Sequence, residues 1–96
     1  MIKILIVDDN HQKISQVRDA LIAGYNIPDD MIDTACCQSE GRDKMSKTAY
    51  DVVVLDLVLP FGSEDELEQD GAIKFLRLIE QNSTIKLPLQ VIGLTE

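Results

Sequence analysis

The sequence contains few cysteines, few basic residues and no long apolar run, and each scarcity excludes a class of protein. Its two cysteines, Cys36 and Cys37, are adjacent, so they offer neither a disulfide framework nor the spacing of metal ligands. The longest apolar run near the N-terminus, residues 4–7, is too short for a signal sequence or a membrane span. These scarcities together predict a reduced, cytoplasmic protein.

Basic residues are outnumbered by acidic ones. Nine lysines and arginines stand against 17 aspartates and glutamates, and the net charge is −8 at pH 7. A nucleic-acid-binding protein gains affinity by neutralising phosphates with basic side chains, so this balance argues against such a partner. Glycine is also missing from the loop after the first predicted strand, which reads Asp8-Asp9-Asn10. A dinucleotide site needs glycine there to approach a pyrophosphate, which makes that class the weakest alternative.

The composition is that of one ordinary globular domain. The chain has 96 residues, of which 45% are hydrophobic and 27% are charged. No internal repeat or low-complexity tract marks a boundary, so residues 1–96 are expected to form a single domain. The net acidity fits a cation site as well as a solvated surface.

The chain alternates between strand and helix periodicity. Four short runs rich in apolar and β-branched residues are expected to be strands, and helical spacing of apolar residues predicts three helices between them. The strands are expected at residues 2–7, 31–36, 51–56 and 89–94, and the helices at 11–23, 39–48 and 71–81. Strands joined in this way run parallel, and right-handed connections place helices on both faces. The fold class is therefore expected to be α/β, a doubly wound parallel sheet of order βαβαβαβ.

Local signals predict where the helices end and which side they bury. Asn10 is expected to cap the first helix and Gly24 to stop it. Ser63 and Glu66 have the spacing of a capping box, which predicts a short helical turn there. Apolar side chains at helical spacing are expected to face the sheet: Ile14, Val17, Leu21 and Ile22 in the first helix, Met45 and Ala49 at the second, and Ala72, Ile73, Leu76 and Ile79 in the third.

Polar side chains follow three of the predicted strands at their carboxyl ends, where ligands of open parallel sheets bind. Asp8 and Asp9 end the first strand, and Asp56 ends the third. Thr95 follows the fourth. If the first and third strands are neighbours, their ends lie about 4.8 Å apart and three carboxylates converge. Such oxygen ligands suit Mg²⁺, and a carboxylate beside this cation can attack a phosphoryl group.

Taken singly, each of these aspartates has a simpler explanation. An aspartate after a strand is most often a helix cap or a turn residue, and this describes both Asp8 and Asp9. A site is favoured by the coincidence of an acidic pair, a further aspartate and a hydroxyl, each at the carboxyl end of a strand.

The segments that carry these residues resemble the response-regulator receiver domain of two-component signalling. Residues 4–10 read ILIVDDN, residues 50–60 read YDVVVLDLVLP and residues 91–95 read VIGLT. The resemblance covers essentially the whole chain, in order and with suitable spacing. It implies a flavodoxin-like doubly wound sheet and a cytoplasmic phosphoprotein of a phosphorelay.

The resemblance also implies a role for each site residue. Asp56 would be the phosphoacceptor, taking the phosphoryl group from a histidine kinase or a phosphotransfer protein. Asp9 and Asp56 would bind Mg²⁺ directly, Asp8 would act largely through water, and the main-chain carbonyl of Val58 would complete the protein ligands. Thr95 would be the switch hydroxyl that hydrogen-bonds the phosphoryl oxygen. The domain would be no enzyme beyond its own phosphorylation and dephosphorylation, and would bind neither membrane nor nucleic acid.

The sequence departs from the family pattern at two places. In the family an Asp-Gly pair follows the position of Pro60 almost at once, whereas here the pair is Asp70-Gly71, so the acidic segment 61–70 is inserted beside the site. The sequence also stops at Glu96, directly after the fourth strand, where a full receiver continues through a helix, a strand and a helix. The lysine that follows the fifth strand of the family therefore has no counterpart. We expect a piece of a longer protein, or a truncated form that borrows cover from another chain in a homodimer with exchanged elements.

Two other functions stay open at this point. The first is a receiver-like interaction or dimerisation module that does not signal by phosphorylation. The second is a Mg²⁺-dependent phosphatase with an aspartate nucleophile. That chemistry usually needs a second aspartate two residues after the nucleophile, and Val58 occupies this position.

Overall fold

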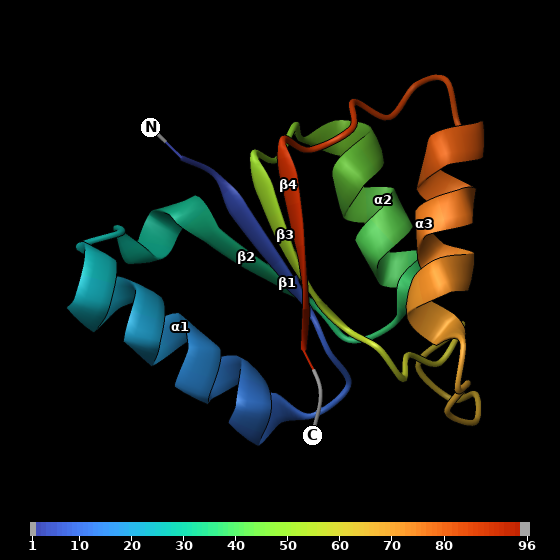
Figure 1. The fold of residues 1–96 in the computed structure, drawn as a ribbon, viewed down its shortest axis with the longest axis horizontal. Coiled ribbons are helices and arrows are strands. Elements are labelled where there is room, and N and C mark those ends of the chain that lie inside the picture. Colours follow the sequence, from blue (N-terminus) through green and yellow to red (C-terminus); the bar gives the residue numbers. More distant parts are fainter. Residues whose placement is uncertain (1, 95–96) are drawn as a thin grey trace.

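The chain folds as a four-stranded sheet with helices on both faces. The computed structural model describes residues 2–94. Its elements are β1 (Ile4–Val7), α1 (His11–Tyr25), the short 3₁₀ helix η1 (Asp29–Met31), β2 (Ile32–Ala35), α2 (Gln38–Lys47), β3 (Val52–Asp56), α3 (Gly71–Gln81) and β4 (Gln90–Leu94). The strands are parallel and lie in the order β2-β1-β3-β4. α1 covers one face, and α2 and α3 cover the other (Figure 1), which confirms the predicted doubly wound α/β layout.

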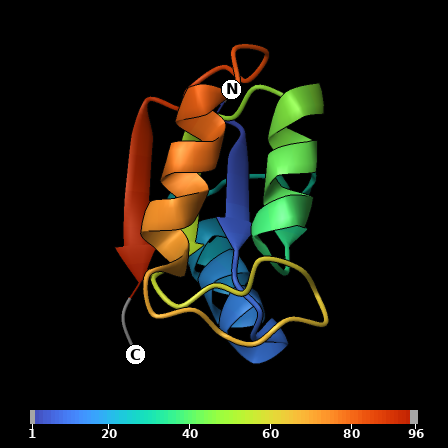
Figure 2. The same cartoon turned by 90° about the vertical axis from the view of Figure 1, so that its right-hand side faces the viewer.

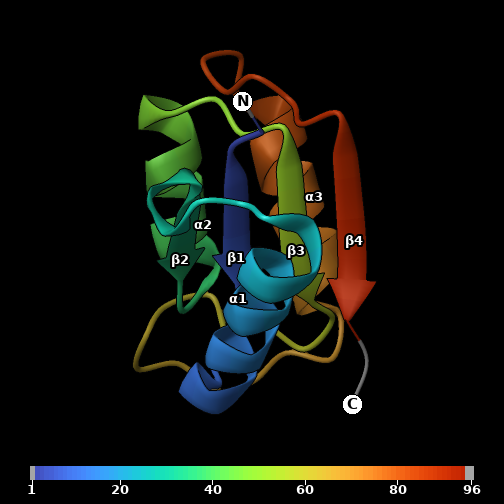
Figure 3. The same cartoon turned by 90° about the vertical axis from the view of Figure 1, so that its left-hand side faces the viewer.

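The central strand β1 is buried on both faces, which explains its unbroken apolar sequence. Successive side chains of a strand point to opposite faces. Leu5 and Val7 accordingly join the larger core beneath α2 and α3, and Ile4 and Ile6 join the smaller core beneath α1. None of the four is more than 2% exposed. Figure 2 looks onto the face covered by α2 and α3, and Figure 3 looks onto the face covered by α1.

The first helix starts where expected but ends later. The side chain of Asn10 accepts hydrogen bonds from the backbone N–H groups of Gln12 and Lys13, which caps the helix start. The predicted stop at Gly24 is wrong, because the helix continues through Tyr25. Asn26 then adopts the left-handed conformation at φ 55°, which asparagine tolerates better than most residues.

The buried side of α3 differs from the expected one by one position. Ala72 and Ile79 are buried, but Ile73 is 56% exposed and Phe75 is fully buried in its place. Positions 72, 75 and 79 lie on one face of a helix, and position 73 is rotated away from it. Gly41 of α2 permits the close approach of Phe75, because a Cβ there would lie 2.9 Å from Cε1 of the ring.

The short helix α2 buries polar and small residues as well as apolar ones. Met45 is buried as expected, whereas Ala49 follows the helix and is exposed. Gln38 and Gly41 form the rest of the buried side. The side of α2 that contacts α3 was therefore hard to predict from the sequence, because few of its residues are apolar.

The acidic segment 61–70 is a loop beside the carboxyl edge of the sheet, with no helical turn in it. The backbone N–H of Gly62 donates to Oδ2 of Asp65 at 2.8 Å, and the N–H of Asp65 donates to the carbonyl of Gly62. This tight turn takes the place of the capping box predicted for Ser63 and Glu66. A turn closed by the Asp65 side chain leaves no helix for that box to cap.

The β4 edge of the sheet is exposed within residues 2–94. β4 pairs with β3 alone, and most of its residues are exposed. A groove of about 530 Å³ lies between this edge and α1, with Leu21, Val54 and Ile92 among the apolar side chains that line it. None of the described helices is long and apolar enough to span a membrane.

Candidate functional site

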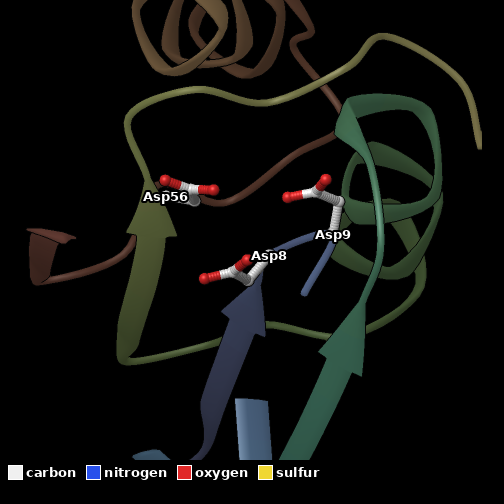
Figure 4. A group of neighbouring side chains, drawn as sticks. All are labelled: Asp8, Asp9 and Asp56. Carbon is white, nitrogen blue, oxygen red and sulfur yellow. The ribbon is translucent and has the colours of Figure 1, made fainter. Parts of the chain in front are cut away.

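Three carboxylates meet at the carboxyl edge of the two central strands. β1 pairs with β3 in a register that places Val7 opposite Leu55, so the residues after both strands emerge side by side. Asp8, Asp9 and Asp56 each offer an oxygen, and these oxygens lie within 4.8 Å of one another. Figure 4 shows Asp56 at the end of β3 and the acidic pair at the end of β1, around one small space. The sequence predicted this convergence from the ends of the strands.

Asp8 is the most deeply buried of the three, at 1% exposure. Its Oδ1 accepts a hydrogen bond from the backbone N–H of Asn10 at 2.9 Å. Burial raises the pKa of the Asp8 carboxyl above its usual value, and the charge of Asp56 adds to this, while the bond from Asn10 and the charge of Lys13 act against it. Asp8 is thus held in a place that disfavours its ionised form even with the Lys13 ammonium beside it.

Asp56 is nearly as buried, at 5% exposure. The backbone N–H of Val58 donates to Oδ1 of Asp56 at 3.3 Å. Leu57 lies between them, and its carbonyl accepts from the N–H of Ala72 at the start of α3. The loop that holds the Asp56 carboxylate is therefore fixed to the helix behind it.

Asp9 differs from the other two because its side chain is exposed. It adds a negative charge to the cluster from the solvent side, whereas Asp8 and Asp56 form the buried floor. A cation that enters the cluster can keep water molecules on this open side. Mg²⁺ usually binds proteins in this way.

Lys13 is a site residue that the sequence reasoning missed. Its Nζ lies 3.3 Å from Oδ2 of Asp8 and 3.5 Å from Oδ1 of Asp56. Side chains in the first turn of a helix point back toward its start, so Lys13 reaches over the acidic floor from α1. The Asn10 cap was the available signal, because it fixes the helix start and with it the residues of the first turn.

Gln38 is the second residue that was missed, and it anchors the acidic segment beside the site. Its side chain is 1% exposed, and Nε2 donates to the carbonyl of Leu59 at 3.1 Å and to Glu68 at 3.4 Å. The backbone N–H of Gln38 also donates to the carbonyl of Pro60. Lys74 of α3 contacts the same carboxylate oxygen of Glu68, at 3.2 Å. The inserted segment is thus attached to both α2 and α3.

The donors of the cluster fit a hard divalent cation. All three side chains offer oxygen, and Oδ2 of Asp8 is buried without a hydrogen bond from any residue in 2–94, its described contact being the ion pair with Lys13. Carboxylates in such a place suit Mg²⁺. For Val58 the structure describes the N–H contact, so the role of its carbonyl stays a prediction. Thr95 lies outside the described residues.

Comparisons with known proteins bear on the fold. No family model matches the chain. The chain is 26% identical over 93 residues to the uncharacterized protein y4jS of Sinorhizobium fredii, and this match covers 97% of the chain but 22% of that protein. Among solved structures it is similar to the N-terminal domain of an uncharacterized protein from Wolinella succinogenes, with a TM-score of 0.67 and 20% identity. That match covers all of this chain and 67% of the other, and it supports the parallel α/β architecture.

Proposed function

We propose that the chain is a receiver-like phosphoacceptor domain in which Asp56 takes a phosphoryl group from a histidine kinase or a phosphotransfer protein. The observation that carries the proposal is the buried carboxylate of Asp56, which lies within 4.8 Å of two further carboxylates at the carboxyl edge of a parallel sheet. This is the edge at which such sheets bind ligands. A single carboxylate would be ordinary there, whereas three that converge on one space suit a bound cation and a phosphoryl group.

Asp56 would act as the nucleophile. Its Oδ1 accepts from the N–H of Val58 and faces Lys13, which leaves Oδ2 to attack phosphorus. The new bond joins Oδ2 to phosphorus, and the bond from phosphorus to the donor's nitrogen or oxygen breaks with its electron pair going to the donor. Asp8, Asp9 and Asp56 would hold Mg²⁺, with the carbonyl of Val58 as a further ligand, and the ion supplies charge neutralisation to the transferring group.

The test is phosphorylation by a small phosphodonor. The chain is incubated with acetyl phosphate and Mg²⁺, and intact-mass and peptide mass spectrometry then locate the product. We expect one phosphoryl group, on Asp56, and none when EDTA replaces Mg²⁺. Asp56→Asn should abolish the product while keeping the fold, because it removes the nucleophile and retains the volume.

A matched control makes the same chemical change far from the site. Asp30→Asn alters an exposed aspartate of η1, which leads into the amino end of β2, and it should be phosphorylated like the wild type. The absence of phosphate from the wild-type chain would overturn the proposal. Phosphate on Asp8 or Asp9 in place of Asp56 would show that the nucleophile had been assigned to the wrong residue.

A second candidate function is an interaction module that pairs with a second copy of itself and carries no phosphate. It is favoured by the open edge of β4 and by the adjoining apolar groove, where Ile92 is 41% exposed. Open strand edges beside apolar surface promote pairing between chains. In this case sedimentation would show a dimer that Ile92→Lys weakens, and acetyl phosphate would leave the mass unchanged.

A further inference from the structure

The ammonium group of Lys13 lies between the two buried carboxylates of the site. It is 3.3 Å from Asp8 and 3.5 Å from Asp56, and its side chain is only 17% exposed. The Asn10 cap fixes the first turn of α1, so this ammonium is delivered from a rigid element. The contact is therefore part of the built site and differs from a flexible surface ion pair.

The charges around this point can be counted. Among residues 2–94, Asp8, Asp9 and Asp56 contribute three negative charges when ionised, and Lys13 contributes one positive charge, so these four side chains carry a net −2. An ammonium in contact with two carboxylates lowers the negative potential that a metal ion would meet there. A divalent cation that binds the same oxygens is therefore repelled by the ammonium, which reduces its net attraction to the cluster.

We propose that Lys13 is a tethered cation that competes with Mg²⁺ for Asp8 and Asp56 and so sets the affinity of the cluster for the ion. The inference rests on the Mg²⁺ site of the proposed function. Without the ion, the Lys13 ammonium neutralises part of the buried acidic floor. When the ion binds, Lys13 gives up its contact with Asp8, with Asp56 or with both. Removing its charge should tighten Mg²⁺ binding, whereas a purely structural ion pair would leave the affinity unchanged.

The experiment compares Lys13→Met with the wild type by calorimetric titration with MgCl₂ at constant ionic strength. Methionine keeps the apolar stem that packs over the floor and removes the charge. We expect about tenfold tighter binding of Mg²⁺ by Lys13→Met, from the lost repulsion across a few ångströms of partly hydrated space. Lys13→Arg keeps the charge and should bind Mg²⁺ close to the wild-type affinity.

A second measurement needs no metal-bound activity. In EDTA, Lys13→Met should melt at a lower temperature than the wild type, because the buried carboxylates lose their cation, and Mg²⁺ should reduce this difference. If the methionine variant does not fold, both measurements are repeated with Lys13→Gln, which also removes the charge.

The outcomes separate the two proposals. If the wild type binds Mg²⁺ and the charge-removing variants bind it equally or more weakly, the competition by Lys13 is overturned and the metal site stands. If neither the wild type nor any variant binds Mg²⁺, the metal site of the proposed function is overturned, and the competition with it.

Discussion

Asp8 carries an electrostatic cost in the folded chain. It is almost fully buried, one of its oxygens accepts from Asn10, and the other faces Lys13. Its pKa is nevertheless raised, so burial and the neighbouring Asp56 outweigh these two contacts. The ionised form is thus less favourable in the folded chain than in the unfolded chain.

This imbalance predicts that Asp8→Asn stabilises the metal-free protein at neutral pH. At a pH above the raised pKa the wild type bears the full cost of the buried charge, and the variant bears none. As the pH falls through the raised pKa toward 3.8, the wild type binds a proton and the difference shrinks. Urea unfolding in EDTA at several pH values measures this. A variant that is less stable than the wild type at pH 7 would show that the Lys13 ion pair outweighs the burial.

Removal of Asp9 should have little effect on the stability of the metal-free protein. Its side chain is exposed, and its removal leaves the buried carboxylates of Asp8 and Asp56 in place. Asp9→Ala should leave the free energy of unfolding in EDTA within about 0.5 kcal/mol of the wild type, as for most surface changes. It should weaken Mg²⁺ binding by about tenfold or more, because one charged ligand of three is lost. Calorimetric titration measures the affinity, and unchanged binding would remove Asp9 from the ligand set.

Cys36 should be a slow nucleophile despite being partly exposed. Burial raises the pKa of its thiol to about 11, with further contributions from Cys37 and Glu40, against an ordinary value of 9.0. The thiolate fraction at neutral pH falls about 100-fold, and its higher basicity recovers part of the rate, so alkylation should be about tenfold slower than for a free thiol. Iodoacetamide labelling of the native chain and of the chain in urea gives the comparison. Equal rates would contradict the raised pKa.

The acidic residues of the site could be predicted from the sequence, but the residues that support them could not. Asp8, Asp9 and Asp56 end strands, and parallel strands that are neighbours must bring their ends together. Lys13 and Gln38 reach the site from helices, and their reach depends on how each helix docks on the sheet. Sequence periodicity indicates the general side of a helix that is buried, but it does not indicate where the end of a long side chain lies.

At the scale of the elements, the connection from β3 to α3 depends on a glycine. A Cβ at Gly71 would lie 2.6 Å from the backbone nitrogen of Leu59, which has no room to move because Leu59 is fully buried. The start of α3 is therefore pressed directly against the loop that follows Asp56. Only a residue without a side chain permits this approach.

Gly71→Ala should accordingly destabilise the fold by about 2 kcal/mol or more, as expected when backbone must shift to relieve a clash. Gly24→Ala is the matched control, because nothing lies within 4 Å of a Cβ at that exposed helical position. It should stabilise the protein by about 0.5–1 kcal/mol through the higher helix propensity of alanine. Urea unfolding of both variants gives the two values, and equal effects at the two positions would contradict the close packing at Gly71.

The positions of the helices could be predicted, while their ends and faces were less certain. α3 starts and ends as expected, yet Ile73 faces solvent and Phe75 faces the core. Both side chains are apolar, so the pattern alone does not choose between two faces that lie a fraction of a turn apart. At the end of α1, Gly24 and Asn26 both suit a left-handed cap, and the helix uses the later one.

At the scale of the whole molecule, the net charge of −8 acts in two ways that experiments can separate. A general excess of negative charge destabilises a compact chain by self-repulsion, and any salt relieves it. A specific site relieves the repulsion among its own carboxylates only when an ion that fits the site binds there. The carboxyl edge concentrates three of the charges within 4.8 Å, so much of the effect of Mg²⁺ should come from this edge.

Mg²⁺ should therefore raise the melting temperature beyond the effect of ionic strength. An ion that binds only the folded chain stabilises it by about 2.7 kcal/mol at 100 times its dissociation constant. For a domain of this size each kcal/mol raises the melting temperature by about 4–8 °C. The melting temperature in MgCl₂ should exceed that in KCl of equal ionic strength. Asp9→Ala should lose about half of the excess, because tenfold weaker binding leaves about 1.4 kcal/mol of stabilisation at the same Mg²⁺ concentration. An equal rise for the wild type and Asp9→Ala would mean that Mg²⁺ acts on the overall charge, with no contribution from the cluster.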